Sequence, residues 1–440
     1  MRSIRLEFLV LGTALSLAAC GEVVVEEGNN NPDPTLMAVT PTDGPLGGGT
    51  QATVTGGELT DAAVVVVGPF VADNIQVSDA GTVTFVTPPG LVAGVPQDIL
   101  VFNENGFTKL PGAFTYNPVP EISAADVNHG NVGGGTQLMI AGSGFMTSNA
   151  NVEVSIGGVA ATDVNVVDDQ TVTVKTGVAP PAMAFQSVDI TLSSDNGDAV
   201  FEQAFTYTRS GLLVAEKGRN GTGRGLFYVD PMTGVATQIG EVEVTPTRMS
   251  ASPDGWIYEV GNVRGQSLSK YLVKMDPLTG QAQAIDLLRD PTKSVKRMRS
   301  LAFVGGMLYG YNRDGYFSAI DPATANFTEL GPQDTTYNSA ACVERRDASS
   351  VYYAGSFDQS LDSVNLATGA IAPGPLLGGT SSQKCHGMAL FNGTYYVLDL
   401  DRGNGDVTYL EKLEPVTGLR TQIALMPSHV TGLTATPAGY

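Results

Sequence analysis

The sequence predicts an all-β protein in which two tandem immunoglobulin-like sandwiches are followed by a five-bladed β-propeller. Two observations lead to this prediction: a tandem duplication over residues 36–208 and a five-fold repeat over residues 209–440. Both regions consist of short alternating apolar segments separated by Gly- and Pro-rich turns, which is the pattern of short antiparallel strands. At 440 residues the chain is also too long for a single hydrophobic core, and about three domains are expected from its length.

The C-terminal repeat is a strand that runs into an Asp-Pro-x-Thr-Gly turn. Successive copies are 46, 45, 44 and 49 residues apart, which is the spacing of four-stranded propeller blades. Asp bonds its own backbone two residues on, Pro presets φ and Gly supplies a positive φ, so we interpret these residues as turn formers rather than as ligands. The copies begin at Asp230, Asp276, Asp321, Asn365 and Glu414.

The two ends of the repeat region are incomplete in complementary ways. The first repeat lacks an inner strand, whereas the last has an apolar segment at 430–435 with no further strand after it. Pairing the two ends would complete one blade and leave no exposed sheet edge, which gives five blades. Inner strands are expected at 249–252, 300–304, 339–343, 386–390 and 432–436. The remaining strands of the fifth repeat are expected at 394–398, 409–413 and 420–424.

Residues 36–117 and 118–208 are two copies of one unit. Each has seven or so short strands in about 85 residues, as expected for an immunoglobulin-like sandwich. The entry sequences are Gly47-Gly48-Gly49-Thr50 and Gly133-Gly134-Gly135-Thr136, and the exit sequences are Phe114-Thr115-Tyr116 and Phe205-Thr206-Tyr207. These sequences resemble those of IPT/TIG domains. The resemblance implies spacers or ligand-contact modules of surface receptors and secreted enzymes, and it implies no reaction. No helix signal or Lys-Ser/Thr pair follows the Gly-rich turns, so we do not interpret them as phosphate loops.

Residues 1–19 have the pattern of a lipoprotein signal peptide. Two arginines within the first five residues precede an apolar stretch at 8–19, which ends in Leu17-Ala18-Ala19-Cys20. This ending resembles the lipobox of bacterial lipoproteins. The resemblance implies diacylglycerol on the Cys20 sulfur, cleavage before Cys20 and acylation of the new amine, which together anchor a protein to a membrane. The alternative is a short uncleaved membrane helix, but the stretch is shorter than the roughly 20 residues needed to span a bilayer.

The expected location is therefore the cell envelope, with the outer membrane or cell surface favoured because Gly21 rather than Asp follows the lipidated cysteine. Residues 20–35 have no hydrophobic period and many turn formers, and they are expected to form a flexible acidic tether.

Residues 1–208 hold 22 Asp/Glu against 4 Lys/Arg, whereas residues 209–440 hold 22 Asp/Glu against 20 Lys/Arg. Such an acidic front half excludes nucleic acid as a partner, because its phosphates require clustered Lys and Arg.

Two cysteines remain beyond Cys20. Cys342 and Cys385 are 43 residues apart, close to one repeat, which places them in the inner strands of adjacent blades. In an oxidising compartment they would form a disulfide. The alternative is two buried thiols that act as small apolar side chains, and the sequence leaves the choice open.

Strand order gathers basic residues around one mouth of the predicted propeller. The segments that enter the inner strands share this face with the hairpins that join the second and third strands, and the sum is a positive potential in an acidic protein. Arg forks suit the carboxylates and phosphates of an anionic glycan or of a protein partner. The alternative is a set of solvated loops neutralised by neighbouring aspartates. The candidate ligand-binding residues are Arg248, Lys296, Arg297, Arg299, Tyr337, Lys384, His386 and His429, and the hairpins add Arg219, Arg224, Arg264, Arg313 and Arg402.

Neither a cofactor nor a metal is expected. His386 and His429 fall in adjacent blades, but two histidines without a third ligand are a weak zinc signal. Residues 399–406 space oxygen atoms somewhat like a calcium loop, yet Arg402 occupies a ligand position and an ordinary hairpin is favoured. The sequence does not decide whether this hairpin binds calcium.

The function predicted from the sequence is that of a lipid-anchored envelope protein, a non-catalytic binding or adhesion module that presents its propeller to an anionic glycan or protein partner. One alternative is a propeller hydrolase or lyase that acts on polysaccharide, and another is a structural surface protein without a small ligand. The expected inner strands contain no Asp or Glu, whereas glycan hydrolysis needs two carboxylates. A Gly-x-Ser-x-Gly elbow beside the histidines is also lacking, which counts further against an enzyme.

Overall fold

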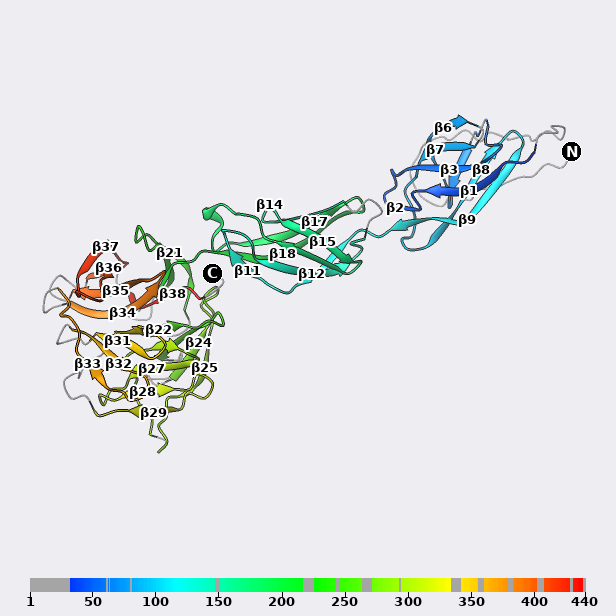
Figure 1. Ribbon diagram of the computed structural model, residues 1–440. Helices are drawn as coiled ribbons and strands as arrows, with labels where there is room; N and C mark the ends of the chain where they lie inside the picture. Colours follow the sequence, from blue (N-terminus) through cyan, green and yellow to red (C-terminus); the bar gives the residue numbers. More distant parts are fainter. Residues whose placement is uncertain are drawn as a thin grey trace. The chain divides into compact units, whose positions relative to one another are not determined.

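The computed structural model describes residues 32–60, 62, 64–79, 81–146, 151–216, 225–242, 245–262, 271–292, 294–333, 342–354, 360–378, 383–401, 407–427 and 430–437. The protein is all-β, as predicted: the helical content of these residues is one turn of 3-10 helix, η1 (Pro181–Met183) (Figure 1). Among these residues, no helix has the length and apolar character needed to cross a membrane. The chain divides into two compact units. One holds the described residues up to Asn128 with Gly133–Ala179 and Ser187–Thr206, and the other holds His129–Val132, Pro180–Gln186 and those from Tyr207 onward.

The first immunoglobulin-like domain consists of two antiparallel-rich sheets with the strand orders β1-β3-β7-β6 and β2-β9-β8-β4-β5. Side chains on β3 alternate between the core and solvent, so that Ala52 and Val54 are fully buried, as are Val83 and Phe85 on the neighbouring β7. The strands are β1 (Thr35–Thr40), β2 (Asp43–Pro45), β3 (Gln51–Gly57), β4 (Val64–Val67), β5 (Phe70–Val71), β6 (Asp73–Asp79), β7 (Thr82–Val86), β8 (Pro96–Asn103) and β9 (Gly106–Asn117).

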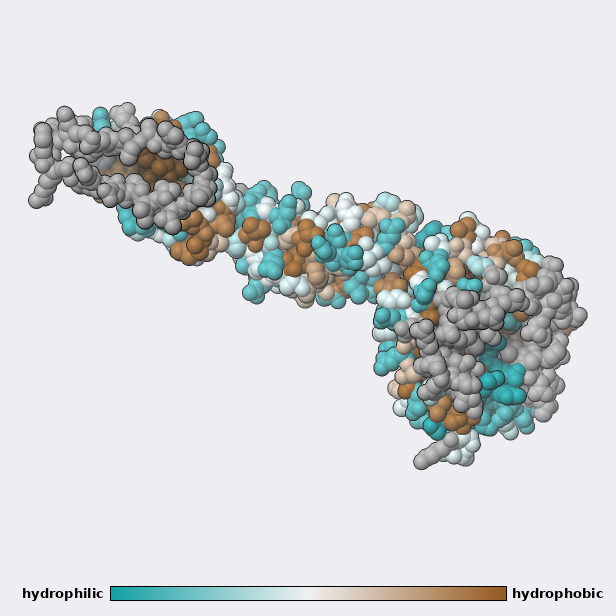
Figure 2. Space-filling view, turned by 180° about the vertical axis from the view of Figure 1, so that it is seen from behind, coloured by the Kyte–Doolittle hydropathy of each residue, from teal (hydrophilic) through white to brown (hydrophobic). Residues whose placement is uncertain are grey.

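The second immunoglobulin-like domain repeats this topology strand for strand, with the orders β10-β12-β16-β15 and β11-β18-β17-β13-β14. Each domain therefore has nine strands rather than about seven, because β2, β5, β11 and β14 are pairing segments of only two or three residues. Apolar and polar residues are interspersed over the visible face of this domain (Figure 2), as is normal for soluble surfaces. The strands are β10 (Glu121–Ala125), β11 (His129–Asn131), β12 (Gln137–Ser143), β13 (Val152–Ile156), β14 (Val159–Ala160), β15 (Thr162–Asp168), β16 (Thr171–Lys175), β17 (Ser187–Ser194) and β18 (Gly197–Thr208).

The Gly-rich entries of the two domains are turns, as the sequence predicts. Gly48 and Gly134 both have φ near +77°, and a Cβ at either position would collide with backbone atoms of the facing loop. The next amide in each turn, Gly49 or Gly135, donates a 2.8 Å hydrogen bond to the carbonyl of Thr87 or Thr176. The glycines therefore allow a close backbone approach rather than forming an anion site.

The described residues from 212 onward form five four-stranded antiparallel sheets. The strands of the first three sheets are β38 (Val430–Ala435), β19 (Leu212–Glu216), β20 (Gly225–Val229) and β21 (Ala236–Glu241); β22 (Thr245–Ala251), β23 (Ile257–Asn262), β24 (Tyr271–Met275) and β25 (Ala282–Leu287); β26 (Ala302–Val304), β27 (Met307–Tyr311), β28 (Phe317–Ile320) and β29 (Phe327–Leu330). Those of the last two are β30 (Cys342–Arg345), β31 (Ser350–Ala354), β32 (Leu361–Asn365) and β33 (Ile371–Ala372); β34 (Gln383–Phe391), β35 (Thr394–Asp401), β36 (Val407–Leu413) and β37 (Arg420–Leu425).

The two ends of the repeat region pair with each other, as the sequence predicts. β38 lies antiparallel to β19, with Leu212 opposite Ala435 and Glu216 opposite Val430. The first strands of the five sheets also contact one another in the cyclic order β22, β26, β30, β34 and β38, and β38 contacts β22. Each sheet is thus neighbour to two others through its first strand.

The repeated turns join the third and fourth strands and have the predicted internal bonds. In the second sheet, the Asp276 carboxylate accepts the amide of Leu278 at 2.7 Å, and the Asp276 carbonyl accepts the amide of Gly280 at 2.8 Å. Position five of the turn has a positive φ in all five repeats, even in the third, where Ala325 replaces Gly and has φ +58°.

One expectation about the first strands is wrong. The sequence predicts one of them at 339–343 without acidic residues, but β30 continues through Glu344 to Arg345, which pairs with Val351. The strand extends two residues past the end of the apolar segment because backbone pairing, rather than side-chain character, determines where it ends.

Candidate ligand-binding site

A narrow cavity lies where the first strands of the five sheets converge. Its lining includes Arg248, Ser300, Cys342, His386 and Gly432, one residue from each strand or from the segment directly before it. The space open to the centre of a water-sized molecule is about 10 Å³, which is enough for about one such molecule. A sugar or peptide therefore cannot enter the cavity and would have to bind outside it.

β-Bulges place two polar side chains at this cavity. The pairing of β34 with β35 shifts register between Cys385 and Gly387, so His386 is the extra residue. A similar shift in β22 lies between Pro246 and Arg248. Because a bulge changes the direction in which nearby side chains point, these two irregularities put Arg248 and His386 into the lining of an otherwise apolar ring.

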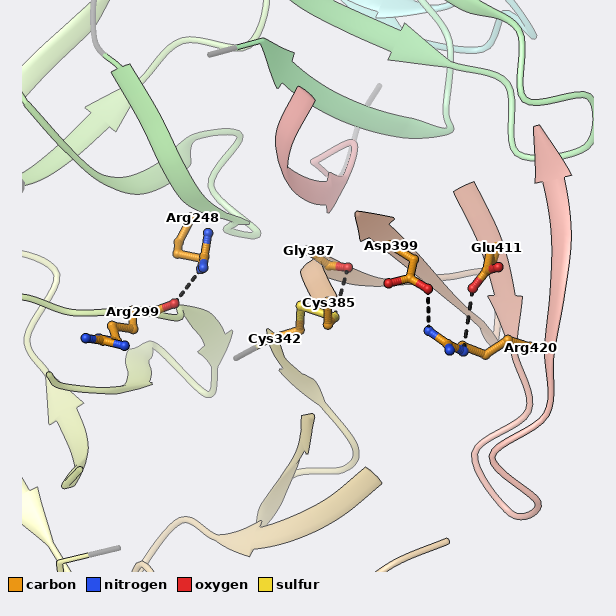
Figure 3. Close-up of a disulfide and its surroundings, with 8 residues drawn as sticks. All are labelled: Arg248, Arg299, Cys342, Cys385, Gly387, Asp399, Glu411 and Arg420. Atoms are coloured by element: carbon orange, nitrogen blue, oxygen red, sulfur yellow. Dashed lines mark hydrogen bonds and ion pairs between the residues drawn. A yellow bond between two sulfur atoms is a disulfide. The ribbon is translucent and has the colours of Figure 1, made fainter. Parts of the chain in front are cut away.

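A disulfide joins two first strands beside the cavity. It links Cys342 of β30 to Cys385 of β34, with the two Cα atoms 5.9 Å apart (Figure 3). The Cys385 sulfur lies 3.6 Å from the Gly387 carbonyl oxygen, so the disulfide adjoins the bulge that positions His386. Of the two alternatives left open by the sequence, the structure contains the disulfide.

Four arginines, which we call the basic cluster, lie near one another, and the first of them lines the cavity: Arg248, Arg297, Arg299 and Arg313. The Arg248 Nε donates a hydrogen bond to the Arg299 carbonyl, while the Arg299 guanidinium points away from Arg248 (Figure 3). A 2.8 Å hydrogen bond from the Arg313 amide to the Arg297 carbonyl brings the β27–β28 hairpin next to the segment before β26. The structure thus places these four predicted residues together.

The basic cluster is an electrostatically strained group of like charges. Burial, together with the positive charge of Arg299, lowers the pKa of Arg248 to about 10. Burial also lowers the pKa of Arg299, and the charges of Arg313 and Arg297 lower it further. Both shifts have the sign that partial burial and neighbouring positive charges produce, so an anion at this position would be stabilised.

Lys296 does not join the basic cluster. Its Nζ lies 2.5 Å from Oδ2 of Asp314, and this hydrogen bond raises the pKa of the lysine despite partial burial. The charges of Glu329 and Asp290 act in the same direction. For this residue the structure favours the alternative of basic loops that are neutralised by neighbouring carboxylates.

Several of the predicted positions lie outside the described residues: Cys20, Tyr337, His429, Arg219, Arg224, Arg264 and Arg402. Lys384 lies in β34, but its side chain is not described. The structure therefore does not test whether His386 and His429 lie close together. Within the described part of the chain, no group of three or more His, Cys, Asp or Glu could hold a metal ion.

A buried ion cluster that the sequence does not reveal lies on the outer part of the fifth sheet (Figure 3). Arg420 of β37 is 2.6 Å from Asp399 of β35 and 3.6 Å from Glu411 of β36, and all three side chains are at most 10% exposed. Burial raises the pKa of Glu411, Arg420 lowers it, and Asp399 raises it again. Asp399, the first residue of the hairpin at 399–406, is therefore engaged by an arginine, while residues 402–406 of that hairpin lie outside the described residues. No local pattern marks this cluster, because its members come from three strands.

Glu344 is a half-buried carboxylate that lies just beyond the strand segment expected from the sequence. Its Oε1 accepts the Arg345 amide at 2.8 Å, and burial raises its pKa to about 7. It is not among the residues that line the cavity. A single carboxylate outside the cavity does not provide the pair that glycan hydrolysis requires.

Comparison with known proteins identifies the two N-terminal domains. Residues 34–116 and 120–208 each match the IPT/TIG domain family. Together with the paired sheets described above, this match shows that both are immunoglobulin-like IPT/TIG domains. The match does not extend to the five-sheet region.

The sequence and structural similarities to individual proteins are distant. Plexin A3 of Danio rerio is 28% identical over 145 residues, which are 32% of this chain and 8% of that protein. An auxiliary nutrient binding protein from Bacteroides ovatus is 16% identical with a TM-score of 0.31, over 70% of this chain and 85% of its own. Another from Bacteroides thetaiotaomicron is 13% identical with a TM-score of 0.29, over 69% of this chain and 70% of its own. Similarity this low assigns neither a ligand nor an activity.

Proposed function

We propose that the protein is a lipid-anchored cell-envelope module whose C-terminal domain is a five-bladed β-propeller that binds an anionic glycan. The two IPT/TIG domains would act as spacers between the membrane and this domain. Five four-stranded sheets, first strands in cyclic contact and paired chain ends support the propeller assignment. Each property is expected of a ring that closes by joining its first and last strands.

The observation that supports the binding proposal is that the arginines of the basic cluster lie close together. Arg297, Arg299 and Arg313 come from two segments 14 or more residues apart, yet they lie close enough for two of them to lower the pKa of the third. The positive charges of neighbouring arginines add, so an anion bound at this position would be stabilised by their combined potential. Arg forks bind carboxylates and sulfates in a bidentate manner, which suits an acidic polysaccharide.

The enzyme alternative receives less support from the described residues. The described residues of the cavity lining include Arg, His and Ser but no Asp or Glu, whereas a glycosidase needs two carboxylates across the scissile bond. Glu344 alone does not meet this requirement. A partner protein that presents carboxylates would use the same basic cluster, so it is an outcome of the test below rather than a second proposal.

The binding test uses the mature chain and an array of acidic and neutral glycans. Replacing Arg297, Arg299 and Arg313 together by Ala should weaken binding of acidic glycans at least about tenfold, or about 1.4 kcal/mol, and added salt should weaken the wild type. Arg248 is left intact because it is half-buried and its Nε donates a hydrogen bond to the Arg299 carbonyl.

The matched control is the double variant Arg345→Ala and Arg346→Ala. Arg345 is exposed, and Arg346 stacks 5.4 Å from the ring centre of Tyr352, so both are charged residues outside the basic cluster. Arg420 is unsuitable as a control because it holds the buried ion cluster together. Equal binding by both variants, or no glycan binding by the wild type, would refute the glycan proposal. If the protein captures an acidic protein but no glycan, the basic cluster binds a protein partner instead.

The anchoring part of the proposal rests on the sequence Leu17-Ala18-Ala19-Cys20, which lies outside the described residues. Cys20→Ser should abolish labelling with radioactive palmitate and release the protein from the membrane fraction of a bacterial host, because the thioether to diacylglycerol cannot form. A substituted protein that still incorporates palmitate and sediments with membranes would show that Cys20 is not the lipidation site.

A further inference from the structure

We infer that residues 23–25, three consecutive valines, bind to an exposed face of the first immunoglobulin-like domain of the same chain. The valines lie outside the described residues, whereas the residues of the face are described. This face belongs to a different domain from the basic cluster, so the inference does not depend on glycan binding. The face, which we call the apolar face, consists of Val64, Val66, Val71, Leu100, Phe102 and Phe107.

The apolar face is the solvent side of the sheet β2-β9-β8-β4-β5. Side chains alternate along β8, where Ile99 and Val101 belong to the core. Leu100 and Phe102 therefore point to the opposite side of the sheet. Phe102 lies opposite Phe107 of β9, and the two rings stack with their centroids 5.5 Å apart.

The apolar face continues onto β4 and β5. Val66 of β4 lies opposite Leu100 on one side and Val71 of β5 on the other. Val64 occupies the same side of β4 two residues earlier. Phe107 and Val71 are each 59% exposed. A contiguous apolar patch of this kind is typical of a binding surface, whereas scattered apolar residues are not.

The second immunoglobulin-like domain provides an internal comparison, because its strand order and pairing repeat those of the first. Polar residues occupy its positions that match Val64, Val66, Leu100, Phe102 and Phe107. In the same order, these polar residues are Glu153, Ser155, Thr191, Ser193 and Asp198. The exception is Val200, which matches Lys109. The fold therefore does not require apolar side chains at the five positions, and their presence in the first domain indicates a contact.

The described residues begin next to the apolar face. A Cβ at Gly106, the residue before Phe107, would lie 3.3 Å from an oxygen of the Asp33 carboxylate, so the chain enters β1 beside the edge of this face. Asp33 follows Val25 by eight positions. A random coil of this length averages about 16 Å end to end and reaches at most about 27 Å. The apolar face spans three strand spacings, or about 14 Å, so the valines can reach it.

Size and charge favour the valines over other occupants. Strand spacing gives the apolar face an area on the order of 300 Å², well below the roughly 800 Å² that each partner of a stable complex buries. A second copy would therefore be held weakly, whereas a short linker places the valines at a millimolar local concentration. An anionic lipid surface is disfavoured, because the single basic residue of residues 36–117 is Lys109, and its Nζ lies 2.5 Å from Asp98.

Binding of the valines would determine how far the first domain stands from the membrane. If Cys20 carries lipid as proposed above, only Gly21 and Glu22 would separate the anchor from the bound segment. The first domain would then be held at the lipid surface. This consequence rests on the proposed anchoring, whereas binding of the valines does not.

Photo-cross-linking tests which molecule covers the apolar face. The full chain with p-benzoylphenylalanine in place of Phe107 should form an intramolecular cross-link to residues 21–31, detected by mass spectrometry after digestion. Replacing the three valines together by Ser should lower the yield at least about fivefold, because their apolar surface no longer drives binding. Replacing residues 29–31, three asparagines, by Ser is the matched control and should leave the yield unchanged. The same photoreactive residue at Asp198 should give no cross-link to residues 21–31.

Proteolysis provides a second measurement on a chain without the photoreactive group. Pancreatic elastase cleaves after small apolar residues, and Phe107→Ser should speed its cleavage at residues 23–25 at least about fivefold by releasing them. Val200→Ser, at an exposed valine of the second domain, should not change the rate. Equal rates in both variants would overturn the inference, as would a cross-link from position 107 to a second copy or to lipid. Neither experiment uses a glycan or requires lipid on Cys20, so failure here leaves the proposed function standing.

Discussion

At the scale of single residues, a backbone angle matters as much as side-chain identity in the repeated turns. Gly280 has φ +69° and lies where a Cβ would overlap the Glu241 carbonyl. Ala325 holds the corresponding position in the next repeat with φ +58°, and its side chain is fully buried in the core of that sheet. The left-handed angle is therefore required by all five turns, while the space for a methyl group differs between them.

Gly280→Ala and Gly393→Ala separate these two effects. Gly393 also has a positive φ, +76°, but a methyl group added there would have no neighbouring atom within 4 Å. Gly393→Ala should cost about 1–2 kcal/mol for the angle alone. Gly280→Ala should cost more, because the added methyl also displaces the backbone at Glu241. Chemical denaturation of the two variants measures both losses, and equal losses would show that the collision is relieved without cost.

At the scale of elements, the sequence predicted strands well where their pattern is regular. The four strands expected in the fifth repeat correspond to β34, β35, β36 and β37, each found within a few residues of its expected bounds. The alternation of apolar side chains carries this information locally. The turns were predictable for the same reason, since Asp, Pro and Gly occupy fixed positions within six residues.

The irregular features of the candidate site were harder to predict. The bulge directly before Arg248 and the bulge at His386 depend on register with a neighbouring strand, which a single strand does not encode. The pairing of Lys296 with Asp314 and the burial of Arg420 depend on partners 18 to 21 residues away along the chain. The predicted strand order was therefore sufficient to group the arginines of the basic cluster. It was not sufficient to show that Lys296 is paired with a carboxylate.

At the scale of the whole C-terminal domain, stability depends on a contact between residues more than 200 positions apart. β38 completes the sheet of β19 and also touches the first strands on both sides, β22 and β34. Its Val430 and Leu433 are about 1% exposed and belong to the same core as Leu212 and Leu398. One strand thus joins the cores of neighbouring sheets, so we expect the five sheets to unfold together rather than one after another.

Deletion of residues 430–440 tests this cooperativity. It should expose the pairing edge of β19 and remove two fully packed apolar side chains, which costs at least about 3–6 kcal/mol by their burial alone. Deletion of residues 438–440 is the control, because it leaves β38 complete. Differential scanning calorimetry should show that the transition of the C-terminal domain moves to a much lower temperature, or disappears, only in the longer deletion. A transition at the wild-type temperature after loss of β38 would mean that the sheets are stable independently, and the closed-ring arrangement of a five-bladed propeller would then be wrong.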